Sequence, residues 1–183
     1  MRSEEPDYFV VTEQLIRDKA RPYVPIGEKQ KFIQLVGSVC YEQMNVGCLT
    51  KDTATPPLYK EHPILKQKYL AAALLKLYLR VDFTPANAVD PWMMTDEAFD
   101  YFCGLRLLSQ IERIQLWTGD VSLRNKCYDL IHDFMDLREM LNSEIHGLIR
   151  AMNDTLARFQ MLQAVHAAPE YLAERKEALA NVN

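Results

Sequence analysis

The chain has 183 residues, of which 49% are hydrophobic and 25% are charged, and its formal net charge is −4. This length is typical of one globular domain, and the composition excludes intrinsic disorder. The apolar stretches are shorter than the roughly 20 residues of a membrane span, and the N-terminus lacks the features of a secretory signal. We therefore expect a single cytoplasmic domain over residues 1–183.

The first half of the chain is predicted to contain three helices and one loop. Residues 7–19 suit a short helix, which the two prolines of residues 21–25 end. Apolar residues at three- and four-residue steps predict a second helix that ends near Gly47. A threonine- and proline-rich loop follows at about residues 48–60, and its length indicates a mobile or binding segment. A wide apolar face predicts the third helix, from His62 to Val81.

The second half is predicted to contain a fourth helix and a long C-terminal helix. Thr95, followed by two acidic residues, has the pattern of an N-cap, and the fourth helix should continue to Trp117. Residues 121–167 repeat their apolar positions every eleven residues, about 3.67 per turn, as a straight α-helix does. Unbroken, this helix would extend about 70 Å. It therefore either breaks near Asn142–Gly147 or exposes apolar surface, and Pro169 is expected to end it.

The fold class expected from these elements is all-α, because no segment alternates with period two for long enough to predict a sheet. We expect an irregular bundle of five to six helices. The long C-terminal helix and the third and fourth helices should form its core.

Motifs that carry chemistry are absent from the sequence. No serine lies in a Gly-x-Ser-x-Gly motif, and the six glycines form no phosphate-binding loop. The four cysteines include no Cys-x-x-Cys pair, and Cys40, Cys103 and Cys127 lie on apolar helical stripes, where a reduced cysteine acts as a small hydrophobe. We expect no enzyme activity, no catalytic residue, no metal and no cofactor.

Polar residues share one face of the long helix. His132, Asp136, Glu139, Ser143 and His146 follow at steps of four, three, four and three. A metal site is one interpretation, but a di-iron site needs a second helix of this kind. A solvated face is the interpretation that we favour.

Two charged surfaces are candidate binding sites. Residues 82–183 carry 16 acidic and 9 basic side chains, and an acidic face that could imitate a phosphate backbone is predicted at Asp129, Asp133, Asp136, Glu139 and Glu144. Residues 1–81 carry 12 basic and 9 acidic side chains, and phosphate contacts could come from Lys60, Lys66, Lys68, Lys76 and Arg80. The acidic balance of the whole chain gives nucleic-acid binding no further support, so solubilising lysines are the more conservative interpretation.

Three segments in the first half of the chain read Pro-Tyr-Val-Pro-Ile-Gly-Glu-Lys at residues 22–29, Pro-Pro-Leu-Tyr-Lys-Glu at 56–61 and Lys-Tyr-Leu at 68–70. Together they resemble a pattern in small uncharacterised helical proteins of phages and mobile elements of Gram-positive bacteria. The resemblance covers about the first 80 residues and transfers no functional residue. It implies a binding function, which would be either inhibition of a host defence nuclease, such as a CRISPR nuclease, or a role as a virion assembly factor.

These observations predict a non-enzymatic protein-interaction module. A protein partner is expected, and this partner could be a second copy of the chain that forms a homodimer through the long helix. The alternative is a helical protein that binds nucleic acid through the basic face of the third helix. No membrane partner is expected.

Overall fold

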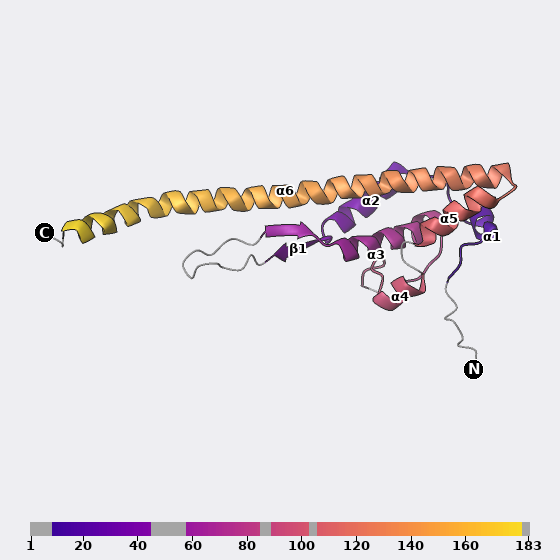
Figure 1. The fold of residues 1–183 in the computed structure, drawn as a ribbon, viewed down its shortest axis with the longest axis horizontal. Coiled ribbons are helices and arrows are strands. Elements are labelled where there is room, and N and C mark those ends of the chain that lie inside the picture. Colours follow the sequence, from indigo (N-terminus) through magenta and orange to yellow (C-terminus); the bar gives the residue numbers. More distant parts are fainter. Residues whose placement is uncertain (1–8, 45–57, 85–88, 103–105, 181–183) are drawn as a thin grey trace, which may run out of the picture. The chain divides into compact units, whose positions relative to one another are not determined.

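The computed structural model describes residues 9–44, 58–84, 89–102 and 106–180, with only the backbone given for residue 164 and residues 166–180 (Figure 1). The chain divides into two compact units. Unit 1 comprises residues 1–40 and 62–145, and unit 2 comprises residues 41–61 and 146–183. The described residues are mostly helical with a long C-terminal helix, as predicted, but they include a small two-stranded sheet, so the fold is not strictly all-α.

The sheet is an antiparallel hairpin of β1 (Tyr41–Met44) and β2 (Leu58–Glu61), in which Tyr41 pairs with Glu61 and Met44 with Leu58. Each strand has four residues, which is too short for a period-two pattern to be recognised in the sequence. Residues 45–57 of the predicted loop lie outside the described residues, and residues 58–60 belong to β2.

The second helix, α2 (Ile26–Gly37), is shorter than predicted, because the expected continuation to Gly47 is replaced by β1. Its last residue is a glycine, and Ser38 follows as the C-cap. Both residue types favour the helix less than alanine does. The Ser38 hydroxyl donates a hydrogen bond to the Leu35 carbonyl at 2.8 Å, which satisfies a carbonyl of the last turn.

The predicted third helix is confirmed and changes its hydrogen-bonding pattern along its length. It consists of α3 (Pro63–Ala73) and the π-helical η1 (Leu74–Leu79). The His62 ring accepts a hydrogen bond from the Leu65 amide, and Pro63 occupies the first turn, where its missing amide hydrogen costs nothing. The helix ends at Arg80, whose φ of 54° is left-handed.

The remaining helices of unit 1 are α1 (Glu13–Asp18), α4 (Asp96–Tyr101), α5 (Arg106–Trp117) and the first part of α6. The expected fourth helix is thus described as two helices, with residues 103–105 outside the described part. Its predicted N-cap is confirmed, because the Thr95 hydroxyl accepts a hydrogen bond from the Ala98 amide at 3.1 Å.

Helix α6 runs from Val121 to Ala180 without interruption, and it contributes to both units (Figure 1). No break occurs near Asn142–Gly147, and Pro169 does not end the helix. A proline inside a helix costs about 3 kcal/mol, because it removes one backbone hydrogen bond and crowds the preceding turn. The neighbouring residues are mainly Ala, Leu, Glu, Lys and Arg, which are strong helix formers and favour continuation.

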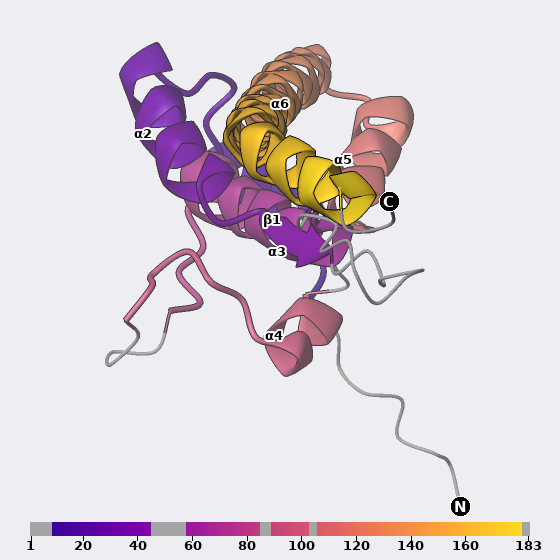
Figure 2. The same ribbon diagram turned by 90° about the vertical axis from the view of Figure 1, so that its left-hand side faces the viewer.

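The core of unit 1 is formed mainly by α2, α3, η1 and the first part of α6, whereas α5 contributes only Leu107 and Ile111 among its described residues, so the prediction that the fourth helix is a main part of the core is wrong and α2 takes that place. In Figure 2, α2, α3 and α5 lie around this part of α6. The largest fully buried side chains are Tyr78, Phe32, Ile16, Leu75, Leu79, Met94, Leu107, Ile111, Leu130, Leu137, Leu141 and Ile145.

Candidate interaction surfaces

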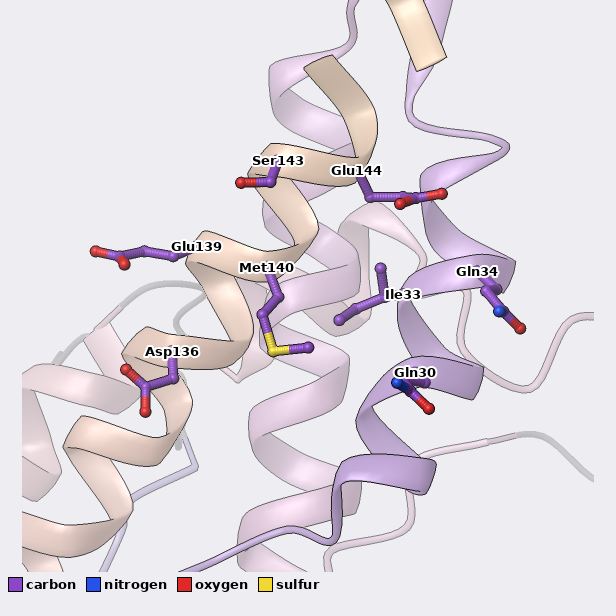
Figure 3. Close-up of a pocket in the computed structure, with 8 residues that line it drawn as sticks. All are labelled: Gln30, Ile33, Gln34, Asp136, Glu139, Met140, Ser143 and Glu144. Atoms are coloured by element: carbon purple, nitrogen blue, oxygen red, sulfur yellow. The ribbon is translucent and has the colours of Figure 1, made fainter. Parts of the chain in front are cut away.

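An open groove lies between α2 and α6 in unit 1, and three of the five predicted acidic residues line it. Its volume is about 900 Å³, and its lining residues are Gln30, Ile33, Gln34, Asp136, Glu139, Met140, Ser143 and Glu144. Figure 3 shows Met140 and Ile33 between the two helices and Glu144 extended toward α2. Carboxylates and amides therefore surround a small apolar floor, an arrangement that suits basic side chains with apolar stems.

Asp133 has a different environment, because its carboxylate lies inside unit 1. Its side chain is 11% exposed, and its Oδ1 lies 2.6 Å from the Lys29 ammonium, which is 7% exposed. The Val24 amide and the Tyr78 hydroxyl each donate a hydrogen bond to Oδ2 at 3.0 Å. Burial, reinforced by the adjacent Asp133, raises the pKa of Tyr78 far above its usual value, so the hydroxyl remains a donor. Asp133 thus holds α2, η1 and α6 together, whereas the sequence suggested a solvent-facing role.

Asp129 is half-buried on α6, four residues before Asp133. A hydrogen bond from Tyr23 to Asp129 raises the pKa of the Tyr23 hydroxyl. The five predicted acidic residues therefore divide into three that line the groove and two that contact the segment before α2.

The predicted basic residues do not form one free face. Lys60 lies in unit 2, where its ammonium pairs with Glu42 across the hairpin at 3.0 Å. In unit 1, Lys66 donates to the Asn142 side chain at 3.1 Å, and Lys68 pairs with Asp96. Each of these lysines would have to leave an internal partner in order to reach a phosphate.

Lys76 is also engaged within unit 1. Its ammonium donates to the Pro91 carbonyl at 2.5 Å and lies 5.0 Å from the Phe83 ring centroid and 5.6 Å from that of Trp92. Cation–π contacts of this kind stabilise a partly buried cation. Arg80 is exposed at the left-handed end of η1.

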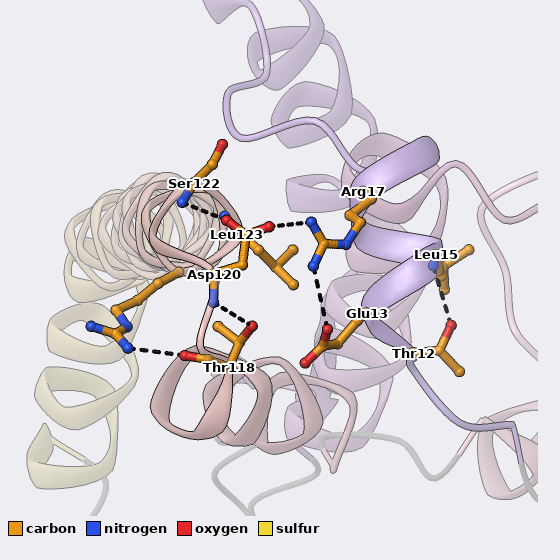
Figure 4. Close-up of polar contacts among 9 residues, drawn as sticks. Thr12, Glu13, Leu15, Arg17, Thr118, Asp120, Ser122 and Leu123 are labelled. Atoms are coloured by element: carbon orange, nitrogen blue, oxygen red, sulfur yellow. Dashed lines mark hydrogen bonds and ion pairs between the residues drawn. The ribbon is translucent and has the colours of Figure 1, made fainter.

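The N-terminus of α6 is fixed by Asp120, a residue outside the predicted sites. Its carboxylate accepts hydrogen bonds from the amides of Ser122 and Leu123 at 2.8 and 3.2 Å, and it pairs with Arg17 of α1 (Figure 4). The Arg17 hydrogen bond is the main cause that lowers the pKa of Asp120, and the two amides add to it. Asp directly before a helix is an N-cap signal, so the sequence could have revealed this residue.

In unit 2, the hairpin contacts α6 through polar groups. The Asn153 side chain accepts a hydrogen bond from the Tyr59 amide at 2.9 Å and donates one to the Tyr59 carbonyl at 3.1 Å. His146 lies 3.2 Å from Glu61. These two contacts explain why β2 follows one side of the helix.

An apolar surface lies beside these contacts in unit 2. A groove of about 350 Å³ is lined by Tyr59, Leu148, Ala151, Met152, Thr155 and Leu156. Four large apolar side chains that follow on α6 are exposed by 58–69%, namely Phe159, Met161, Leu162 and Val165. We call these ten residues the unit 2 apolar surface.

The side chains that could carry chemistry are few in the described part of the chain. Cys40 and Cys127 are buried thiols, and burial raises the pKa of the Cys127 thiol to about 11. Among the described residues, no group of three or more His, Cys, Asp or Glu side chains is arranged to hold a metal ion. Cys48 and Cys103 lie outside the described residues. Within that same part of the chain, no helix has both the length and the apolar character needed to cross a membrane.

Comparisons of the chain with protein-family models, with curated proteins and with solved structures gave no match.

Proposed function

We propose that the protein is a non-enzymatic protein-interaction module and that the unit 2 apolar surface makes the contact. The observation that carries this proposal is the exposure of Phe159, Met161, Leu162 and Val165 within seven residues of one helix. Large apolar side chains scattered singly over a surface are ordinary, whereas contiguous apolar patches mark interaction sites. An aromatic ring beside an apolar groove also has the character of an interface anchor.

The environment of this surface supports binding rather than catalysis. Thr155 is the one hydroxyl-bearing side chain that lines the groove other than Tyr59, and its hydroxyl donates to the Ala151 carbonyl at 2.7 Å. That hydroxyl is therefore satisfied within the helix. Burial of the surrounding side chains by a partner would contribute about 25 cal/mol for each Å² of apolar area toward the costs of association.

The acidic groove of unit 1 favours one finer function within this class. Asp136, Glu139 and Glu144 present carboxylates on successive turns of α6, where lysine and arginine side chains of a partner could contact them. A nuclease that binds nucleic acid displays such side chains. Together with the resemblance to phage and mobile-element proteins, this supports inhibition of a host defence nuclease over a role in assembly. Both roles place the protein in the cytoplasm.

The experiment is affinity purification of the tagged full-length chain from its source cells at moderate salt, with identification of the proteins that accompany it. Val165→Glu is compared with Val121→Glu, because both valines lie on α6 and are 67% and 64% exposed. A partner in stoichiometric amount should accompany the unchanged chain and Val121→Glu but be lost with Val165→Glu.

Two results would contradict the proposal. The first is equal recovery of the partner with both variants, since the contact would then lie elsewhere. The second is recovery of nuclease-sensitive nucleic acid alone, which would favour a role for Lys66, Lys76 and Arg80. A basic partner that is released when Asp136, Glu139 and Glu144 are changed together to the corresponding amides would support the nuclease-inhibitor function.

A further inference from the structure

A second exposed apolar cluster lies at the turn between α5 and α6 in unit 1. Leu116 and Trp117 end α5 and are 74% and 84% exposed, and Val121 begins α6 and is 64% exposed. Figure 1 shows this turn at one end of unit 1. Three large apolar side chains of such exposure within six residues differ from the scattered apolar residues of an ordinary surface. We call these three residues the corner cluster.

The turn that carries the corner cluster is held by polar contacts. The buried Thr118 side chain accepts a hydrogen bond from the Asp120 amide at 3.3 Å, and the Arg124 guanidinium donates to the Thr118 carbonyl at 2.9 Å. Asp120 also pairs with Arg17 of α1 (Figure 4). The fold therefore fixes the turn and leaves the three apolar side chains outside.

The two tryptophans of the chain have opposite environments. Trp92 is half-buried and packs edge-to-face on Phe32, with ring centroids 5.1 Å apart. Trp117, at 84% exposure, contacts little of its own chain and projects from the surface. An indole is a large apolar ring with one polar N–H group, and it is favoured where one end is in an apolar medium and the other is in water. A membrane–water boundary provides both.

The chain is locally basic around the corner cluster. Residues 106–126 carry four basic and two acidic side chains, whereas the remainder of residues 82–183 carries five basic and 14 acidic ones. One of the two acidic residues is Asp120, which is paired with Arg17, and Arg17 also pairs with Glu13 of α1. The other is Glu112, which is exposed. This segment therefore attracts an anionic surface more than the rest of the second half does.

Two exposed arginines lie one helical turn from the corner cluster. Arg113 precedes Leu116 by three residues and Trp117 by four, so at 100° per residue it leaves α5 on the arc between them. Arg124 follows Val121 by three residues and shares its side of α6. Arg113 forms no ion pair with any residue that the structure describes, and the hydrogen bond of Arg124 is to a backbone carbonyl. Neither positive charge is thus neutralised by a carboxylate of the described chain.

From these observations we infer that the corner cluster is a contact site for a membrane surface that contains anionic lipids. Leu116, Trp117 and Val121 would enter the boundary between headgroups and acyl chains. The guanidinium groups of Arg113 and Arg124 would contact lipid phosphates, since arginine extends its charge on an apolar stem. The inference goes beyond the proposed function and is independent of it, because the unit 2 apolar surface takes no part.

The sequence predicted no membrane partner, because its apolar stretches are too short to cross a bilayer. That prediction concerns spanning segments, whereas a surface contact needs only a few apolar side chains beside cations. The exposure of Leu116 and Trp117 is a property of the fold, since apolar residues at the end of an amphipathic helix are expected to pack.

Single-stranded nucleic acid is the other anionic ligand that an exposed tryptophan beside arginines can bind, because bases stack on aromatic rings. Leu116 and Val121 offer no stacking face, although they are exposed by 74% and 64%. Nucleic-acid binding also depends on several phosphate contacts along the strand, and the corner cluster has two arginines beside it. The observations therefore favour lipid, and single-stranded DNA is a comparison in the test.

The test is co-sedimentation of the full-length chain with vesicles of phosphatidylcholine, alone or with an equal part of phosphatidylglycerol. A single myristoyl chain gives an association constant of about 10⁴ M⁻¹, and a contact of this size should be no stronger, so the lipid concentration extends into the millimolar range. The chain should bind the vesicles that contain phosphatidylglycerol, and high salt should release it. Binding to phosphatidylcholine alone should be at least tenfold weaker.

Substitutions identify the site of the contact. Trp117→Ser should weaken vesicle binding at least tenfold, because it removes the ring without changing the charge, and circular dichroism should show an unchanged fold. Arg113→Gln should weaken binding and Glu112→Gln should strengthen it, each by about fivefold, the effect of one charge at an anionic surface. Phe159→Ser is the matched control, since it removes an exposed aromatic ring from unit 2, and it should leave vesicle binding unchanged.

Tryptophan fluorescence measures whether the ring enters the lipid. The chain has two tryptophans, so Trp92→Phe leaves Trp117 as the single reporter and keeps an aromatic ring against Phe32. The emission should move to a shorter wavelength with vesicles that contain phosphatidylglycerol and stay unchanged with single-stranded DNA.

Four results would overturn the inference. They are no binding to phosphatidylglycerol vesicles at any lipid concentration, equal binding by the unchanged chain and Trp117→Ser, an equal loss with Phe159→Ser, and a fluorescence response to single-stranded DNA alone. None of them affects the proposed function, because that function is tested by the recovery of a protein partner with Val165→Glu.

Discussion

Two parts of α6 carry the same apolar repeat in different surroundings. In unit 1, Leu130, Leu141 and Ile145 are fully buried, and α2, α3 and η1 contribute most of the other buried side chains of this core. In unit 2, Met152 stands eleven residues after Leu141 but is only half-buried, and Phe159 is 58% exposed. A periodic apolar face therefore indicates that one side of a helix is suited to packing, but it does not identify the element or molecule that packs against it.

The largest expected difference in the free energy of unfolding is between two substitutions on α6, one in the buried ion pair of unit 1 and one at an exposed position. Asp133→Ala should lower the free energy of unfolding by about 3–5 kcal/mol, because it leaves the Lys29 ammonium buried without its carboxylate. Asp136→Ala is the control, since Asp136 is exposed one turn later, and it should change stability by no more than about 0.5 kcal/mol. Urea unfolding measures both values, and equal losses would contradict the structural role of Asp133.

Two leucines on α6 compare the covered and uncovered parts directly. Leu141→Ala should cost about 2–5 kcal/mol, because the residue is fully buried and its truncation leaves a cavity. Leu162 is 59% exposed, so Leu162→Ala should cost about 0.5 kcal/mol or less at a low protein concentration. Urea unfolding at matched concentrations gives the comparison. A large loss for Leu162→Ala would mean that the chain itself covers this side chain.

Asn153 tests how the hairpin of unit 2 is held on α6. Asn153→Ala removes both hydrogen bonds to Tyr59 and should destabilise the hairpin by about 1–2 kcal/mol. The loss should be detected as faster hydrogen exchange of the β1 and β2 amides, with unit 1 unchanged. Gln160→Ala, a polar and half-buried position seven residues further along α6, is the control and should leave the exchange rates as they are.

The smallest expected effect concerns the start of α6. Asp120→Ala removes the N-cap and the pairing with Arg17. At neutral pH it should lower the free energy of unfolding, and this loss should be smaller than the loss of hairpin stability caused by Asn153→Ala. Because the pKa of Asp120 is lowered in the folded state, its contribution is present above the ordinary pKa of an aspartate and is lost as the pH falls through the lowered pKa. The difference between the unchanged chain and the variant should therefore shrink in acid. A difference that is constant in urea unfolding from neutral pH to strong acid would exclude this role.

The sequence predicted the helices because their signals are local. The eleven-residue repeat of α6, the Thr95 N-cap and the position of Pro63 all depend on neighbours within a few turns. The hairpin escaped prediction because Tyr41 and Glu61 are joined across a long separation in the sequence. Pro169 does not end α6, because the surrounding helix formers outweigh the local tendency of proline to break a helix.

The candidate sites were less predictable than the helices. Spacing on α6 placed Asp133 and Asp136 together, but only the fold shows that Lys29, 104 residues away, neutralises Asp133 and leaves Asp136 in the groove. In the same way, Asn153 gave no signal, because its partner Tyr59 lies 94 residues earlier. Asp120 is the exception, since its N-cap position could have been recognised.

The central claim is that the apolar stripe of α6 is covered within unit 1 and open to a partner in unit 2. Hydrogen exchange along α6 of the purified chain, alone and with the protein partner recovered by affinity purification, tests it most directly. Amides of residues 126–145 should be protected in both samples, whereas those of residues 150–163 should exchange quickly in the chain alone and become protected with the partner. Full protection of residues 150–163 in the chain alone, or none with the partner, would contradict the account.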